Sequence, residues 1–364
     1  MTVIIEAGVL ARAMRSAATV VERANTIPVL SNVRLHAREG SEMMEIVTTN
    51  IDVEYRQYVA LAQPGNLSTT IDAQKLAALA AAAEGAQVSL EDTGKSVIAK
   101  AGRSRWVLPT IAYTNFPELP FDNCGFKVPI SGPLLSNIIS RLSWSVCTEQ
   151  TRYWLCGIYV DPENDKMRFT AVNGFTFASF VSDVPWPVGA PSAIIATKYT
   201  RILERLAGEH DEVELSWSDD KIRTSAGGTV LTGKLIEGTF PDYRRVIPPI
   251  TESPVMVDPE GLRKALKRIE IIGLGKTRGV AIDIRAGALE LQVAGTGSEE
   301  ASESLPANCV AMHRAGFNAG YLAGALESVG GDTVEIHQAT PSDIALIRRA
   351  VPDGAICGVM PMRV

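Results

Sequence analysis

The chain of 364 residues repeats its own pattern about every 124 positions, and this repeat limits the folds that it can adopt. An aromatic-Pro-acid turn at Asn115–Leu119 recurs at Thr239–Tyr243. A helical segment that runs into a strand begins near Ile71, again near Ile195 and a third time near Phe317. Repeats of whole domain size indicate several similar domains instead of one large core.

Each copy alternates helical and strand-like patterns. Three sets of apolar residues are spaced to lie on one helical face: Ile5, Leu10 and Met14; Ile130, Leu135 and Ile139; Val257, Leu262 and Leu266. Alternation of apolar and polar residues predicts strands that include residues 33–36, 44–47, 167–170, 280–283 and 289–292. The order predicts an α+β fold whose helices cover one face of antiparallel sheet. We expect three similar domains at residues 1–122, 127–247 and 250–364, joined by Pro-rich segments.

Composition excludes several classes of protein. Hydrophobic residues make up 46% of the chain and charged residues 21%, which is typical of a folded protein. No stretch approaches the ~18 consecutive apolar residues that a membrane span needs, and the first residues lack a signal-peptide pattern. The five cysteines are scattered without a C-x-x-C pair, which argues against a disulfide framework or a structural metal site and favours the cytoplasm. The net charge of -6 does not by itself suggest a DNA partner.

No enzyme signature is found in the chain. The four histidines are far apart, so a metal or catalytic site built on them is not expected. The segment Gly273–Thr277 resembles the end of a phosphate-binding loop, but Glu270 stands where that loop needs glycine, and Arg278 spoils a G-x-G-x-x-G pattern. A nucleotide-using enzyme is therefore the weaker alternative, and we expect no cofactor.

Several motifs resemble the bacterial DNA sliding clamp, the β subunit of DNA polymerase III. They are Arg152–Gly157, Phe240–Pro248, Val359–Val364, Ile27–Asn32, Gly102–Arg105, and Phe317–Asn318 with Tyr321–Leu322. The match runs from residue 2 to residue 364 without a large gap. The three-copy repeat was found independently of this resemblance.

The resemblance implies a non-catalytic processivity factor. In this family two chains of three domains join head to tail into a ring around duplex DNA, and the ring tethers the polymerase. The implied partners are double-stranded DNA without sequence specificity, the polymerase III catalytic subunit, the clamp loader, and other polymerases and repair proteins with short clamp-binding peptides. The implied location is the cytoplasm, on the nucleoid.

The resemblance also implies DNA-facing residues. The matching positions are Arg23, Gln150, Arg152, Tyr153, Trp154, Lys198 and Arg201. Further basic residues on the same set of helices are Arg12, Arg15, Arg205, Lys264, Lys267 and Arg268. Without the resemblance, these charges would be read as the solvated faces of amphipathic helices. Weak phosphate contacts suit a protein that slides, because many such contacts would create salt-dependent drag.

Ring closure in this family pairs an edge strand of the first domain with one of the third. Here the resemblance implies Arg103, Arg105, Trp106 and Leu108 on one side and Ile271, Ile272, Glu300 and Glu303 on the other. Opposite charges across such an edge would fix the register. The alternative is that Trp106 belongs to the core of its own domain.

An apolar cleft that captures peptides is the working site of the family. The matching positions are Leu155, Val172, Gly174, Phe175, Thr176, Phe177, Pro241, Arg245, Val246, Tyr321, Val359, Met360, Pro361, Met362 and Arg363. Adaptable methionines suit a site that receives many partners. Without the resemblance, Met360 and Met362 would be read as core residues of a last strand.

The chain departs from the family at the rim of this cleft. Where the family commonly has Thr-Asp-Gly-His-Arg-Leu, this chain has Val172–Phe177, so that Phe175 and Thr176 replace a His-Arg pair. Cys156 replaces a usual asparagine, and Ala24 stands where a basic residue is common. We expect an altered peptide preference, and a specialised clamp with different partner peptides is the second alternative.

Overall fold

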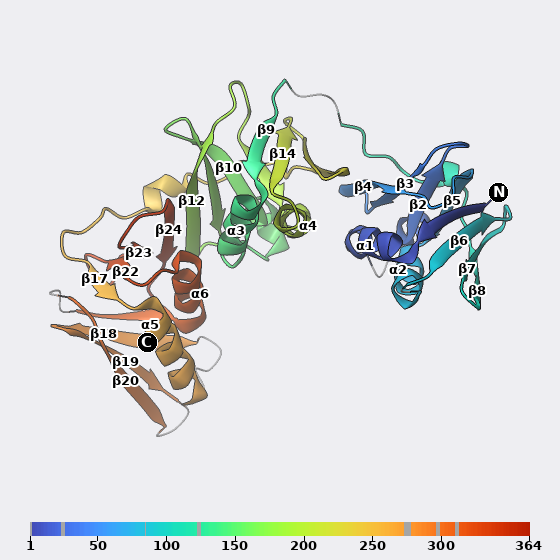
Figure 1. Ribbon diagram of the computed structural model, residues 1–364. Coiled ribbons are helices and arrows are strands. Elements are labelled where there is room, and N and C mark those ends of the chain that lie inside the picture. Colours follow the sequence, from blue (N-terminus) through green and yellow to red (C-terminus); the bar gives the residue numbers. More distant parts are fainter. Residues whose placement is uncertain are drawn as a thin grey trace. The chain divides into compact units, whose positions relative to one another are not determined.

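The computed structural model describes residues 2–22, 26–83, 85–121, 125–272, 278–295, 299–309 and 313–364, and they repeat one order of elements three times (Figure 1). The first copy contains β1 (Thr2–Glu6), α1 (Ala7–Ala17), β2 (Asn32–Ala37), β3 (Met43–Thr49), β4 (Val53–Ala60), β5 (Leu67–Asp72), α2 (Ala73–Ala82), β6 (Gln87–Asp92), β7 (Ser96–Ala101) and β8 (Ser104–Pro109).

The other two copies keep this order. The second contains β9 (Val128–Ser131), α3 (Gly132–Ser143), β10 (Gly157–Glu163), β11 (Lys166–Val172), β12 (Thr176–Pro185), β13 (Ala193–Ala196), α4 (Thr197–Gly208), β14 (Glu212–Trp217), β15 (Lys221–Ala226) and β16 (Thr229–Lys234). The third contains β17 (Val255–Val257), α5 (Pro259–Ile269), β18 (Gly279–Arg285), β19 (Ala288–Ala294), β20 (Glu300–Pro306), β21 (His313–Asn318), α6 (Ala319–Val329), β22 (Val334–His337), β23 (Ala345–Arg349) and β24 (Ala355–Val359). The α+β fold and its internal repeat are confirmed.

The second helix of each copy is followed by a strand, β6, β14 or β22, as the repeated segments predict, and it begins directly after another strand. In the first and third copies a polar residue caps the helix: Asp72 Oδ1 accepts a hydrogen bond from Lys75 N at 2.9 Å, and Asn318 Oδ1 accepts one from Tyr321 N at 3.1 Å. Such caps satisfy backbone donors that a helix leaves free at its start. The strand-to-helix transition is therefore written into the sequence at these positions.

The first helix of each copy begins later than its apolar spacing predicts. Ile5, Ile130 and Val257 lie on β1, β9 and β17, where they pair with Val88, Val213 and Val334. The ladder with a neighbouring strand determines their conformation, and only the remaining apolar residues lie on the helices. Those residues are buried: Leu10, Met14, Leu135, Ile139, Leu262 and Leu266. The predicted strands are confirmed, and they lie within β2, β3, β11, β18 and β19.

The strands form four antiparallel sheets. Two are four-stranded, in the orders β1-β6-β7-β8 and β20-β19-β18-β21. Two are eight-stranded, because β4 pairs with β16 and β12 pairs with β24, which joins sheets of successive copies. Strands β8 and β20 remain at the edges of their sheets.

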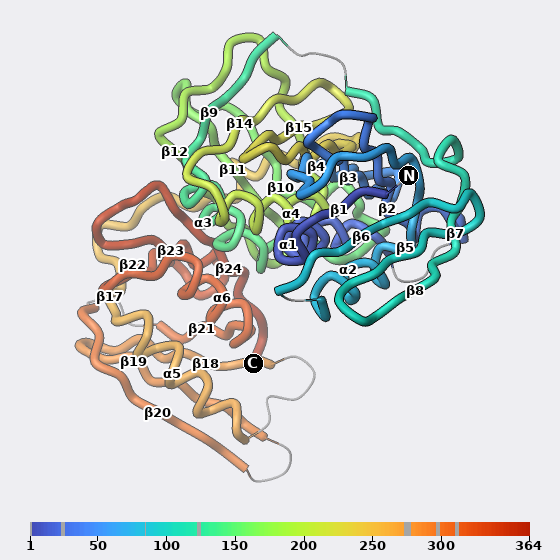
Figure 2. Tube along the Cα trace, turned by 45° about the vertical axis from the view of Figure 1, so that its right-hand side comes forward, coloured from blue at the N-terminus to red at the C-terminus, as the bar shows by residue number. Residues whose placement is uncertain are grey.

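The chain divides into two compact units. One contains residues 1–136 and 198–235, and the other contains residues 137–197 and 236–364. Each unit holds one eight-stranded and one four-stranded sheet, so the middle copy contributes strands to both. Figure 2 traces the chain through these elements.

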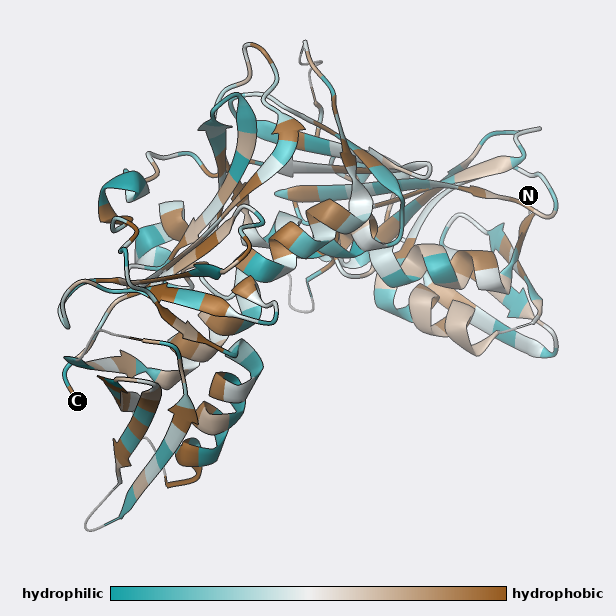
Figure 3. Ribbon diagram, turned by 60° about the vertical axis from the view of Figure 1, so that its left-hand side comes forward, coloured by the Kyte–Doolittle hydropathy of each residue, from teal (hydrophilic) through white to brown (hydrophobic). Residues whose placement is uncertain are grey.

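In each unit, two helices pack against each other and against the strands. Helix α1 contacts α2 in one unit, and α5 contacts α6 in the other (Figures 1 and 2). Apolar and polar residues alternate along helices and strands (Figure 3), which is the pattern of elements that bury one face. No described helix is both long and apolar enough to cross a membrane.

Two glycines allow an aromatic ring to lie against a strand. A Cβ atom on Gly233 of β16 would lie 2.3 Å from Cδ2 of Tyr199, a residue of α4. A Cβ atom on Gly358 of β24 would lie 2.0 Å from Cε1 of Phe177 on the paired strand β12. Both rings are buried, so each fills the space that a side chain would occupy.

Candidate peptide-binding site

A cavity of about 530 Å³ lies in the second unit. It is lined by Gly174, Phe175, Asn318, Tyr321, Met360, Pro361 and Met362. These residues come from the turn between β11 and β12, the start of α6 and the segment after β24. Six of them are among the positions implied for the peptide cleft, and Asn318 was missed for this role. Its place directly before α6 was visible in the sequence, but its neighbours in the cavity come from distant segments.

The turn that carries Phe175 is held by hydrogen bonds to its backbone. Oδ1 of Asn173 accepts from Phe175 N and from Thr176 N, both at 2.9 Å. Gly174 has a φ of 91°, a conformation that side chains with Cβ rarely adopt. Met360 N donates to Phe175 O at 2.9 Å, which ties the turn to the last segment of the chain. The rim of the cavity is therefore an ordered structure.

Two aromatic rings form one wall of the cavity. The ring of Phe175 is 51% exposed, and its centroid lies 6.0 Å from that of Tyr321, with 19° between the ring planes. Asn318 positions Tyr321 as the cap of α6. Met360, 45% exposed, adds a flexible thioether at the mouth. Exposed aromatic and methionine side chains around a concave surface are typical of sites that bind apolar peptide side chains.

A second group of predicted cleft residues surrounds Leu155. Leu155 is buried in a cluster with Cys147, Ile194, Phe240 and Tyr243, and Val172 packs against this cluster. Pro241, Arg245 and Val246 lie beside it, on and next to the short helix η4 (Tyr243–Val246), and are exposed. The structure thus separates the predicted residues into an open cavity and an apolar cluster, both within one unit.

Three further predicted cleft residues lie in the interior and do not line the cavity. Thr176, Phe177 and Val359 are buried in the ladder between β12 and β24. Thr176 Oγ1 lies 2.8 Å from Ser145 Oγ, which holds its side chain toward the interior. The expectation that Thr176 changes the rim is therefore wrong, because its side chain lies in the interior beside Ser145, and of the pair only Phe175 lines the cavity.

Arg152 brings a positive charge to this rim. A Cβ atom on Gly174 would lie 2.5 Å from Nη1 of Arg152, so the guanidinium covers the turn. Nη2 of Arg152 also pairs with Glu149 Oε2 at 2.9 Å. The sequence suggested this residue only for DNA contact, and its place beside Gly174 was not predicted.

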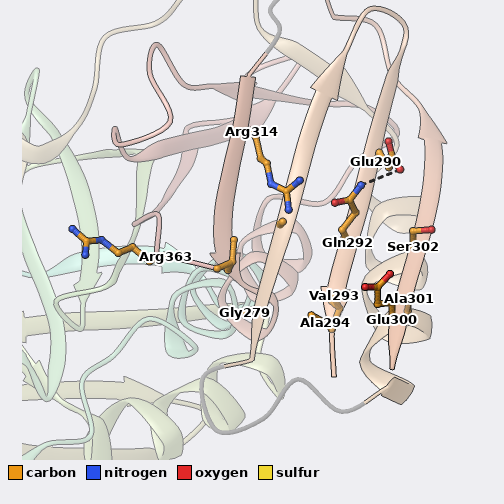
Figure 4. A pocket seen from close by; sticks show the side chains of 12 residues that line it. Gly279, Glu290, Gln292, Val293, Ala294, Glu300, Ala301, Ser302, Arg314 and Arg363 are labelled. Atoms are coloured by element: carbon orange, nitrogen blue, oxygen red, sulfur yellow. Dashed lines mark hydrogen bonds between the residues drawn. The ribbon is translucent and has the colours of Figure 1, made fainter. Parts of the chain in front are cut away.

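Arg363 lines a different and larger cavity. This space of about 700 Å³ lies on the face of the β20-β19-β18-β21 sheet where Glu290, Gln292, Glu300 and Arg314 are displayed (Figure 4). The segment after β24 reaches it by crossing Gly316, whose carbonyl oxygen accepts a hydrogen bond from Met362 N at 2.8 Å. The lining is mostly polar and charged, unlike that of the Phe175 cavity.

The predicted DNA-facing residues lie on two elements, one in each unit. Gln150, Arg152, Tyr153 and Trp154 lie on the short helix η3 (Gln150–Leu155), where Tyr153 is 50% exposed. Lys198 and Arg201 lie on α4 and line a cavity of about 350 Å³ that also includes Arg205 and Glu22. Lys198 Nζ pairs with Glu22 Oε1 at 2.5 Å. Arg23, Ala24 and the segment Gly273–Thr277 lie outside the described residues.

The predicted subunit-contact residues lie at free sheet edges and beside them. Arg103 and Arg105 are exposed, Trp106 is half-buried and Leu108 is buried, at or next to edge strand β8. Glu300 and Glu303 lie on edge strand β20, and Glu303 Oε2 accepts a hydrogen bond from Arg268 Nε at 3.0 Å. Ile271 is 81% exposed and Ile272 is half-buried on η5 (Glu270–Ile272).

A buried carboxylate anchors the short helix beside the Leu155 cluster. Asp161, 3% exposed, accepts a hydrogen bond from the hydroxyl of Tyr243 at 3.1 Å and pairs with Nη2 of Arg244 at 2.7 Å. Burial raises the pKa of Asp161 above its ordinary value, although Arg244 and Tyr243 act in the opposite direction. This desolvated carboxylate therefore contacts two residues of η4, of which Arg244 also pairs with Glu163 Oε2 at 3.0 Å.

The raised pKa of Asp161 predicts a pH dependence of stability. The folded state takes up this proton before the unfolded state does, so this group adds stability as the pH falls through its raised pKa, down to about 4. We expect the difference in melting temperature between the wild type and Asp161→Asn to move in favour of the wild type between pH 7 and about 4. The comparison cancels the other titrating groups. A shift in the opposite direction would show that the ion pair with Arg244 outweighs burial.

Comparison with known proteins identifies the family. Three sequence models match successive parts of the chain: the N-terminal domain of the DNA polymerase III beta subunit at residues 1–120, its central domain at 129–242 and its C-terminal domain at 244–363. The beta sliding clamp of Caulobacter vibrioides is 32% identical over the full length of both chains. That of Pseudomonas aeruginosa is 30% identical over 97% of each.

Solved structures agree with the sequence relatives. A sliding clamp from Pseudomonas aeruginosa bound to griselimycin superimposes with a TM-score of 0.94 at 29% identity, over 100% of each chain. A clamp from Caulobacter crescentus, with PEG bound to its beta-motif tethering region, gives 0.93 at 30% identity over 100% of this chain and 99% of that one. The chain therefore belongs to the family of bacterial β sliding clamps, the β subunits of DNA polymerase III.

Proposed function

We propose that this chain is a non-catalytic processivity factor that closes, as a head-to-tail homodimer, into a ring that slides on duplex DNA. The ring tethers the polymerase III catalytic subunit, and the clamp loader, other polymerases and repair proteins use the same peptide cavity. The proposed domains are residues 1–122, 127–247 and 250–364, and the proposed location is the cytoplasm, on the nucleoid. The comparisons do not favour the nucleotide-using alternative.

The pairing of strands between successive copies carries this proposal. Strand β4 of the first copy pairs with β16 of the second, and β12 of the second pairs with β24 of the third. Strand β20 holds the same place in the third copy as β4 and β12 hold in the first two. The same rule therefore pairs β20 with the equivalent of β16 and β24, which is β8. Since β8 and β20 are both edges within one chain, β20 pairs with β8 of a second copy. Contacts of this heterologous kind form a ring when the rotation closes.

The repeat also predicts the register of this junction. Equivalent residues are found by counting from the first residue pair of each hairpin. In the hairpins β7-β8 and β15-β16, Val107 corresponds to Thr232. In the hairpins β19-β20 and β3-β4, Glu300 corresponds to Glu54. Glu54 and Thr232 are direct partners. We therefore expect Glu300 opposite Val107 of the second copy. Val107 is 54% exposed in the chain whereas Thr232 is 2% exposed, which supports a missing partner strand.

A cysteine cross-link tests the ring and its register. The variant Val107→Cys/Glu300→Cys should form chains of twice 39.0 kDa under mild oxidation, seen on a denaturing gel without reductant. The control Val107→Cys/Ser304→Cys moves one cysteine four residues along β20, about 13 Å away, and should not cross-link. Light scattering should give a dimer for the unmodified protein. A monomer, or equal cross-linking of both variants, would contradict the proposal.

The Phe175 cavity is the proposed peptide site, and its aromatic wall supports this role. A fluorescently labelled peptide with the pattern Gln-Leu-x-Leu-Phe should bind with a dissociation constant of about 1 μM, or about -8 kcal/mol. Met362→Ala removes a side chain of the cavity and should weaken binding by at least about tenfold. The measurement is an anisotropy titration with unlabelled peptide as competitor. Equal affinity of both proteins would place the peptide elsewhere.

The DNA contacts are proposed from the exposed residues of η3 and α4. Tyr153 and Arg201 present an aromatic ring and a guanidinium at the surface. Such groups contact phosphates and sugars, which carry no sequence information. We therefore expect no preference for one duplex sequence.

A further inference from the structure

Two cysteines are neighbours at the base of the short helix η3. Cys147 N donates to the carbonyl oxygen of Leu155 at 3.2 Å, which places the backbone of Cys147 against the peptide group that joins Leu155 to Cys156. Both side chains belong to the apolar cluster around Leu155. Cys147 is 4% exposed, whereas Cys156 is only partly buried.

The thiol of Cys156 holds the end of η3. It donates to the carbonyl oxygens of Glu149 at 3.4 Å and of Arg152 at 3.8 Å. Arg152 departs from helical geometry there, with a φ of -114° and a ψ of 49°, and its N–H donates to the carbonyl oxygen of Glu149 at 3.0 Å, so the thiol is a second donor to that carbonyl. The S–H group therefore contributes to the shape of the segment.

On balance, the surroundings of the Cys156 thiol oppose its ionisation. Burial raises the pKa of Cys156, and the neighbouring Cys147 thiol raises it further through charge and hydrogen bonding. Arg152 lowers the pKa and Glu149 raises it. The thiolate is the reactive form, so oxidation is slow at neutral pH and faster in alkaline solution.

We propose that Cys147 and Cys156, which lie on either side of the segment Gln150–Leu155, form a reversible disulfide. The oxidant is a peroxide. The Cys156 thiolate, whose proton has passed to solvent, attacks one peroxide oxygen, the O–O bond breaks, and a sulfenic acid and hydroxide result; the hydroxide takes up a proton from solvent and becomes water. The Cys147 thiolate then attacks the sulfur of that sulfenic acid, forms the S–S bond and releases a second water. Two thiols and one hydrogen peroxide thus give one disulfide and two waters.

The disulfide removes the S–H donor that bonds Glu149 and Arg152. The guanidinium of Arg152 covers Gly174 at the rim of the Phe175 cavity, so a change in η3 reaches that rim through one side chain. The oxidation state of the two cysteines therefore alters peptide binding. This last step rests on the proposed function, whereas disulfide formation does not.

Peptide mapping tests the bond itself. The intact protein is treated with hydrogen peroxide at about pH 8.5, where more of the thiol is ionised, then alkylated and digested with trypsin without reductant. Trypsin cuts after Arg141, Arg152 and Lys166, which separates the two cysteines into peptides 142–152 and 153–166. We expect these two peptides joined, with the mass of both less two hydrogens, and separated by dithiothreitol. Alkylated thiols, higher oxides of Cys156 or links to another cysteine would overturn the proposal.

Matched variants establish which thiols are needed. Cys147→Ser should stop at an oxidised Cys156 without a linked pair, and Cys156→Ser should leave Cys147 reduced. Cys309→Ser removes a buried cysteine of the other sheet and should leave the linked pair unchanged.

The peptide titration measures the consequence for the cavity. Oxidised wild type should differ from reduced wild type in peptide affinity by at least about threefold, within the range of coupling between connected sites, and dithiothreitol should restore it. Peroxide-treated Cys147→Ser/Cys156→Ser should not change. An equal affinity of oxidised and reduced protein would overturn the link to the cavity. Failure of the reduced protein to bind peptide at all would instead contradict the proposed function.

Discussion

Replacing Gly358 with valine is expected to unfold the region around β24 at a much lower temperature than in the wild type. Even the Cβ atom would lie 2.0 Å from Cε1, 2.5 Å from Cδ1 and 2.7 Å from Cζ of Phe177. Phe177 is 2% exposed and lies on the paired strand, so its ring has no open space to enter. Overpacking of this kind costs about 3 kcal/mol or more.

Thermal unfolding and peptide binding together check this prediction. The segment after β24 carries Met360 and Met362, so the variant should also lose peptide affinity. The control Gly8→Ala lies at an exposed position of helix α1, where the nearest atom to a new Cβ is Arg12 Nη1 at 3.8 Å. It should keep the melting temperature or raise it, because alanine favours helix by about 0.5–1 kcal/mol over glycine. Equal melting temperatures for the wild type and Gly358→Val would contradict the packing argument.

Replacing Phe175 with alanine is expected to weaken binding of the labelled peptide about thirtyfold, or about 2 kcal/mol, as at an interface hot spot. The ring is half-exposed, stacks on Tyr321 and forms one wall of the cavity. Its removal takes away the ring that stacks on Tyr321 and opens the cavity to water. The turn itself should persist, because Asn173 bonds only backbone groups in it.

A panel of peptides separates affinity from preference. Phe175→His introduces the residue that the family resemblance implies at this position and should shift the preference of the cavity away from large apolar anchors. Val188→Ala, at a side chain that is 99% exposed, is the surface control and should bind like the wild type. An unchanged ranking of the peptides in Phe175→His would show that this position does not set the preference.

Local patterns predicted most elements of the fold. The segments near Ile71, Ile195 and Phe317 each contain a helix that is followed by a strand, as predicted, although their first residues lie on the strand before the helix. Ile5, Ile130 and Val257 were assigned to helices instead of strands. Their pairing partners lie some 80 residues away, and no local spacing reports such contacts.

The sequence predicted which residues belong to the site better than it predicted how they are arranged. The family motifs located Phe175, Tyr321 and Met362, which the structure brings together. They did not show that Thr176 lies in the interior, because consecutive residues of β12 are buried and alternation does not distinguish them. Asn318 and Arg152 reach the rim from segments distant in sequence, so only a three-dimensional structure could place them there.

The sharing of sheets between copies has a consequence for how this chain can be divided. A fragment cut at a repeat boundary would separate β4 from β16 or β12 from β24, and would expose a row of unpaired backbone groups. Single repeats should therefore aggregate when they are expressed alone, even though each contains a full set of helices and strands. The repeating unit of this sequence is therefore smaller than the smallest unit that can fold stably in water.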